Sequence, residues 1–249
     1  MNARVRPATA VDPPAQAACA NGGTCERDIC PAAAWSQVPD TSFQSGQSTL
    51  SVAARRIICR EQELHDVVPV ICEGWAASVV MLSDGSRQIL SFLLPGDIVS
   101  AALFFDVRPH CLVEAITDVR YRNIKRAEFR TALFTNRDLF ERLLKTWTKE
   151  TLRADQLIVD LGRRTADERI ARLILNLAER LSERGMVQSA TMEIDFPLRQ
   201  HHIADATGLT PVHVSKVLTE FRRSGLINIS DRALTIVDPV AFRRVAQMR

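Results

Sequence analysis

The chain lacks several features, and each absence excludes a class of protein. Its 249 residues contain no run of eighteen apolar residues, so no transmembrane helix is expected. The N-terminus lacks the apolar core of a signal peptide. A strong net charge is also missing: at +3, the chain as a whole does not demand a polyanionic partner. These absences predict a soluble cytoplasmic protein with no membrane partner, long enough for two small domains.

Catalytic motifs are missing as well. The sequence contains no Gly-rich phosphate-binding loop, no His/Glu motif of the zinc type and no nucleophile elbow. His110 and Cys111 come nearest to a catalytic pair, but adjacent residues on a strand point to opposite faces. We therefore predict that the protein is not an enzyme. A cofactor-carrying redox protein with a merely structural helix-turn-helix is the alternative class.

The order of patterns along the chain predicts an α+β fold. Residues 1–45 are rich in Pro, Ala, Gly and Ser and show little periodicity, so we expect a flexible segment. Between residues 46 and 134, short apolar runs alternate with turn signals, which is typical of a small β-barrel or jelly roll forming a sensor domain. Tight turns are predicted at 83–86 and 95–97. The clearest strands are expected at residues 57–59, 67–72, 77–82, 88–93 and 119–124.

A long helix is predicted next, over residues 135–163. Thr135 or Asn136 can cap it, and apolar residues recur at steps of three or four. A stripe of this length is either core or the seam between two helices. A further helix is expected from Thr165 to about Gly185. The residues that would form a dimer seam are Leu143, Trp147, Ala154, Leu157 and Leu161.

Residues 164–249 are predicted to form a winged helix-turn-helix domain. Two short helical segments with apolar faces meet at Gly208, because glycine turns a helix sharply without a Cβ penalty. Thr210 can cap the second helix, and Pro211 suits its first turn. Residues 226–237 follow as a two-stranded wing. Such a domain places its second helix in the major groove of DNA.

The second helix and its surroundings carry the expected contacts to DNA. From Pro197 onward, eight Lys and Arg residues outnumber four Asp and Glu residues, a local excess that favours a phosphate-binding surface. His201, His202 and His213 are expected to contact phosphates or bases. The predicted DNA-binding residues are Thr210, Val212, His213, Ser215, Lys216, Thr219, Arg222, Arg223 and Arg232.

Short motifs occur in a specific order along residues 45–245. They are Gly74, Asp84-Gly85 followed by residues 87–90, the run 95–99, Asn136, the run 165–171, residues 208–210 and Ser215-Lys216. This order resembles the CRP/FNR family of transcription regulators. The resemblance implies a homodimer paired along the long helix, with a sensor domain that controls the geometry of the DNA-binding heads. It also implies a two-fold symmetric double-stranded DNA site, and RNA polymerase as a partner.

The resemblance also bears on the signal that the protein senses. Cyclic-AMP-binding members of the family hold the ribose and phosphate with a Gly-Glu pair and an Arg-Ser pair. Here Ser100-Ala101 and Pro109-His110 occupy those positions, and Ala154-Asp155 replace the hydroxyl residues that touch adenine. Without the arginine, the phosphate charge would be buried unpaired. Cyclic AMP is therefore not the expected ligand.

FNR-type members bind an oxygen-sensitive 4Fe–4S cluster through three N-terminal cysteines and one in the barrel. Cys19, Cys25 and Cys30 lie in a similar place, with a different spacing, and Cys111 is the best candidate for the fourth thiolate. Three alternatives stay open. The cysteines are incidental to a linker; haem is bound by His110 or Cys111, which is less favoured; or the regulator acts without a ligand, under control by expression or by cysteine oxidation.

The recognition helix departs from the FNR pattern Glu-x-x-Ser-Arg, because residues 212–216 read Val-His-Val-Ser-Lys. Ser215 is kept, and Lys216 can donate to guanine O6 and N7 without the rigid fork of arginine. The glutamate is lost, and His213 is the candidate to replace its contribution. We therefore do not assign the consensus DNA sequence of the family to this chain.

Overall fold

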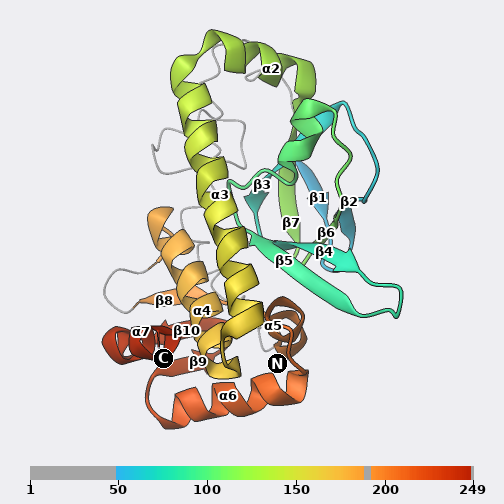
Figure 1. Ribbon diagram of the computed structural model, residues 1–249. Coiled ribbons are helices and arrows are strands. Elements are labelled where there is room, and N and C mark those ends of the chain that lie inside the picture. The colour runs from blue at the N-terminus through green and yellow to red at the C-terminus, as the bar shows by residue number, and fades with distance from the viewer. Residues whose placement is uncertain (1–48, 188–191, 248–249) are drawn as a thin grey trace, which may run out of the picture.

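The computed structural model describes residues 49–187 and 192–247 and shows an N-terminal β-roll, one long helix and a C-terminal head (Figure 1). The fold class is α+β, as predicted. Cys19, Cys25 and Cys30 lie outside the described residues. No helix of the described part is long and apolar enough to span a bilayer. In chain order, the elements are β1 (Leu50–Val52), β2 (Ile57–Cys59), β3 (Val67–Glu73), β4 (Ala76–Met81), β5 (Arg87–Leu93), η2 (Ala101–Phe105), β6 (Leu112–Ala115), β7 (Val119–Lys125), α2 (Arg126–Thr135), α3 (Arg137–Arg163), α4 (Ala166–Glu183), β8 (Glu193–Asp195), α5 (Gln200–Thr207), α6 (Pro211–Arg223), β9 (Ile227–Ser230), β10 (Ala233–Ile236) and α7 (Pro239–Gln247).

Two antiparallel sheets form the β-roll, with the strand orders β1-β7-β3 and β2-β6-β4-β5. Val68 and Ile124 of the first sheet share a core with Ala76 of the second. Phe104 of η2 stacks on Phe129 of α2 in the same core, with 3.8 Å between the ring centroids. The two sheets do not close into a barrel, so of the two predicted forms the jelly-roll-like one is correct.

Both predicted turns of the β-roll are present. In the β4–β5 hairpin, Gly85 has φ of 82° and the Ser86 N–H donates to the Asp84 carboxylate at 2.9 Å. In the second turn, Gly96 has φ of 94° and the Asp97 N–H donates to the Leu94 carbonyl at 2.9 Å. Glycine reaches these left-handed conformations without a steric penalty. The second turn holds Asp97 beside the head.

Helix α3 runs the length of the molecule and begins at the predicted cap (Figure 1). The Asn136 side chain accepts from the Leu139 N–H at 3.0 Å. Leu143 is only 1% exposed, because it packs into the core of its own β-roll. Leu143 is therefore not free to contact the helix of a second chain, so its assignment to the predicted dimer seam is wrong. Trp147 is half-buried and packs edge-on against Phe105, with 5.3 Å between the ring centroids.

The head shares a core with the outer face of the β-roll. Trp75 and Ile89 are buried together with Ile170 of α4 and Ile203 of α5. Within the head, α7 packs on α4, and β10 lies between β8 and β9. The two predicted strands of the wing, β9 and β10, are therefore part of a three-stranded sheet with β8. Because one apolar core joins them, the β-roll and the head are packed as one body.

Candidate DNA-binding interface

Helices α5 and α6 form the predicted helix-turn-helix. Gly208 ends α5 with φ of 65°. A Cβ at this position would lie 3.3 Å from Cδ2 of Leu161, a side chain on the last turn of α3. Thr210 caps α6 by accepting from the His213 N–H at 3.3 Å, and Pro211 occupies the first turn. The turn therefore presents α6 at the surface while it contacts the end of α3.

One side of α6 packs inward and the opposite side is open. Val214, Val217 and Phe221 are buried in the head. An open groove of about 500 Å³ lies on the other side, lined in part by Val212, Ser215, Lys216, Thr219 and Arg223. These lining residues belong to the predicted DNA-binding set. The major groove of B-DNA is wide enough to admit an α-helix, and this side of α6 is open to do so.

The cations of the interface differ in how they are held. Arg223 pairs with Glu220 at 2.7 Å, and Arg222 donates to the Thr219 hydroxyl at 3.4 Å. Within the part of the chain that the structure describes, the Lys216 side chain has no hydrogen bond or ion pair. Arg232 lies in the wing turn with φ of 67°. The Lys216 ammonium is thus the charge on α6 that DNA can engage without breaking an internal contact.

His202 is buried in the head, so the expected contact of this residue with DNA is corrected. Its Nδ1 accepts from the Arg199 N–H at 3.0 Å at the start of α5. Burial, and then the nearby charges of His201 and Arg87, lower its pKa to about 4. The ring is therefore neutral at pH 7 and acts as a cap of α5. His201 and His213 remain exposed.

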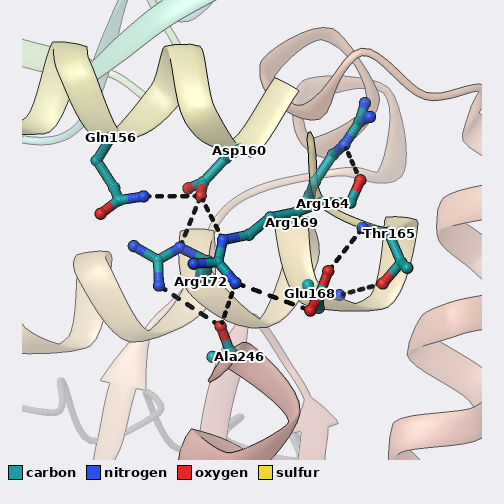
Figure 2. Close-up of polar contacts among 8 residues, drawn as sticks. All are labelled: Gln156, Asp160, Arg164, Thr165, Glu168, Arg169, Arg172 and Ala246. Carbon is teal, nitrogen blue, oxygen red and sulfur yellow. Dashed lines mark hydrogen bonds and ion pairs between the residues drawn. The ribbon is translucent and has the colours of Figure 1, made fainter. Parts of the chain in front are cut away.

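The junction between α3 and the head is held by a cluster of hydrogen bonds around Asp160 (Figure 2). The Asp160 carboxylate accepts from Gln156 at 3.0 Å and pairs with Arg164 at 3.1 Å and with Arg172 at 2.7 Å. Both arginines also reach the Ala246 carbonyl at the end of α7, at 3.5 Å. These contacts join the last turn of α3 to two helices of the head.

Helix α4 starts directly after this junction. Thr165 and Glu168 form a capping box: the Thr165 N–H donates to the Glu168 carboxylate at 2.7 Å, and the Glu168 N–H donates to the Thr165 hydroxyl (Figure 2). Arg169 donates to the Arg164 carbonyl at 2.9 Å and to the Thr207 carbonyl at 3.1 Å. Arg169 therefore connects the junction directly to the C-terminal end of α5.

A second connection joins the β-roll to the head. Asp97 pairs with Arg180 at 2.7 Å and also with Arg184. Arg180 lies in the last turn of α4, and Arg184 directly follows this helix. All three side chains are 12% exposed or less. Burial alone would raise the pKa of Asp97, but the two guanidinium groups outweigh it and hold the pKa below its usual range. The sequence predicted the shape of this turn but not its ion pairs.

Of the candidate cofactor residues, His110 and Cys111 lie in the described β-roll. Cys111 is half-buried, and burial raises the pKa of its thiol. His110 next to it is exposed. Among residues 49–187 and 192–247, no three or more His, Cys, Asp or Glu side chains form a group that could hold a metal ion.

The fold and the interface define a class of protein: a DNA-binding regulator whose helix-turn-helix head is joined to a β-roll by one long helix. Comparisons agree with this class. Residues 168–245 match the family model of the Crp-like helix-turn-helix domain, and residues 49–136 match that of the cyclic nucleotide-binding domain.

The chain belongs to the CRP/FNR family of transcription regulators. The nitrogen fixation regulation protein FixK of Rhizobium meliloti (strain 1021) is 32% identical over 197 residues, which cover 76% of this chain and 82% of the relative. The transcriptional activatory protein AadR of Rhodopseudomonas palustris is 31% identical, over 75% of this chain and 76% of the relative. The structure of FixK2 from Bradyrhizobium japonicum has a TM-score of 0.70 at 26% identity and covers 80% of this chain and 97% of that one.

Proposed function

We propose that the protein regulates transcription as a homodimer whose two α6 helices enter successive major grooves of a two-fold symmetric DNA site. The open side of α6, with the unpaired Lys216, is the observation that carries this proposal. In a two-fold dimer, the two recognition helices would be about one turn of DNA apart, roughly 34 Å. Selection of bound sequences from a random DNA library tests it: an enriched site with inverted half-sites is expected, and no enrichment would refute it.

The dimer seam is proposed on the face of α3 that the β-roll leaves uncovered. Large apolar side chains recur there at helical spacing and lie open in the single chain: Phe140, Leu144, Leu152, Ile158 and Val159. Ala154, Leu157 and Leu161 of the sequence prediction flank this face and are proposed to lie at its edge. Burial of such a stripe against a second copy would remove apolar surface from water along most of α3.

The proposed mechanism couples this seam to DNA through the junction. A shift of one α3 helix against the other would move Asp160, and with it the arginines that join α3 to the head. A signal that favours one packing of the seam would then change the spacing of the two α6 helices. Contact with RNA polymerase follows from the proposed role as a transcription regulator, and co-purification on promoter DNA tests it.

Redox or oxygen sensing is the second proposal, and the three cysteines within residues 19–30 carry it. Four thiolates are what a 4Fe–4S cluster requires, so Cys111 or another cysteine must complete the set. Anaerobic purification tests this directly: about four iron and four sulfide per chain are expected, and Cys25→Ser is expected to abolish both. If anaerobically purified protein contains no iron and binds DNA with unchanged affinity, the proposed cluster is refuted.

A further inference from the structure

Val212 stands out on the recognition helix because the protein leaves it uncovered. Its exposed fraction is 67%, whereas Val214 and Val217 on the same helix are at most 5% exposed. Val212 lines the open groove together with Lys216, which follows one turn later on the same side. What separates Val212 from other exposed valines is its position at the start of the helix proposed to enter the major groove, where its side chain is free to contact a base.

The chemistry around Val212 restricts what that partner can be. The first turn of α6 contains no acidic residue, so it offers no carboxylate to accept from the amino group of cytosine. Of the four bases, thymine alone presents a methyl group in the major groove. The other base edges expose hydrogen-bonding groups, which a valine would remove from water without satisfying them.

We propose that Val212 selects thymine in each half-site by packing its methyl groups against the C5-methyl group of that base. This inference rests on the proposed binding of α6 in the major groove. Val212 and Lys216 are four residues apart, roughly 6 Å along the helix, and successive bases rise about 3.4 Å. The thymine therefore lies one or two base pairs from the guanine that Lys216 contacts.

The test uses the full-length protein and the DNA site selected from a random library. Each thymine of the site is replaced in turn by uracil, which differs only by the missing methyl group. One thymine per half-site is expected to be sensitive, one or two base pairs from the guanine that Lys216 contacts. Replacing this thymine by uracil should lower the affinity of the wild-type protein about fourfold, because one buried methyl group contributes about 0.8 kcal/mol. Val212→Ala shortens the side chain and is expected to reduce the preference for thymine over uracil at that position, whereas Val212→Ile should keep the preference.

A matched control separates this effect from a general loss of apolar surface. Val240→Ala, at a valine that is 61% exposed at the start of α7, is expected to leave the thymine preference intact. Circular dichroism verifies that each variant is folded. If Val212→Ala and the wild type respond alike to uracil at every position, the inference is wrong while the proposed DNA binding stands. If selection enriches no site at all, the proposed function itself fails, and this inference fails with it.

Discussion

Single residues of the interface divide into those held by the protein and those free to meet DNA. Glu220 already neutralises Arg223, and Thr219 accepts from Arg222, so both guanidinium groups have partners at the surface. Lys216 has none in the described part of the chain. A lysine is a compact point charge on a flexible stem, which suits guanine O6 and N7 but lacks the geometric selectivity of arginine. We therefore propose that Lys216 reads the bases, and that the arginines contact the DNA backbone.

This division predicts different losses for two substitutions on α6. Lys216→Ala is expected to weaken binding to the selected site by about 1–3 kcal/mol and to change which base is preferred. Arg223→Ala should weaken selected and random DNA alike and should flatten the plot of log affinity against log salt by about one unit. Equilibrium titrations at several salt concentrations measure both effects. Equal losses on selected and random DNA for Lys216→Ala would contradict its base-reading role.

His202 predicts a pH dependence of the stability of the head. Its pKa is about 4 in the folded protein, against 6.5 for an unperturbed histidine. Between these values the unfolded chain binds a proton that the folded chain does not, so stability is complete above pH 6.5 and is lost as the pH falls toward 4. His202→Gln, which can still accept from the Arg199 N–H, should flatten the profile of melting temperature between pH 4 and 6.5.

The matched control is His201→Gln, because the neighbouring His201 is exposed. It should leave the slope of the profile unchanged. A His202→Gln variant that loses stability with acid as steeply as the wild type would show that other groups dominate this range.

At the scale of elements, α3 has two apolar faces: one packs on the β-roll, and the other is uncovered in the single chain. Leu139 and Leu143 point into the β-roll, while Ile158 is 70% exposed on the uncovered side. The sequence predicted the length and the cap of this helix correctly. The sequence did not distinguish the two faces, because both are apolar. An apolar stripe at helical spacing does not indicate whether it packs on its own domain or on a second chain.

The uncovered face of α3 predicts how the dimer can be broken. Ile158→Glu would place two like charges near the two-fold axis and remove apolar surface from the seam, so it should yield monomers. Leu82→Glu is the control, because Leu82 is 52% exposed next to the β4–β5 turn, away from α3. Light scattering measures the mass of both variants. A dimeric Ile158→Glu protein would mean that the seam lies elsewhere.

The other elements show what sequence patterns could and could not predict. Strands β2, β3, β4, β5 and β7 and both turns were predicted because turn residues flank apolar runs. β1 and β8 span three residues each, too short for a recognisable alternation. β4 is apolar without alternation because the β-roll covers one face and the head covers the other. The ion pairs of Asp97 and Asp160 join residues up to 87 positions apart, which no local pattern indicates.

At the scale of the whole molecule, the β-roll and the head are held together by an apolar core and an ionic cluster at its edge. The apolar core alone does not fix the orientation of the head, because the hydrophobic effect is non-directional and depends on the apolar area that is buried. The pairs of Asp97 with Arg180 and Arg184 fix where α4 lies against the turn at residues 95–97. A motion that separates α4 from this turn would break these pairs, so they contribute to the stability of the packed arrangement.

Asp97→Asn is therefore expected to loosen the head from the β-roll. The amide keeps the size of the side chain but removes the carboxylate that pairs with the buried Arg180 and leaves only the interaction with Glu150, so a loss of up to about 3–5 kcal/mol is expected. Asp66→Asn is the matched control: Asp66 pairs with Arg126 at 2.9 Å but is 97% exposed, and such pairs contribute at most about 1 kcal/mol. Urea denaturation followed by circular dichroism compares the two free energies of unfolding. If both variants unfold at the same urea concentration, Asp97 does not hold the head, and the apolar core around Trp75 alone sets its position.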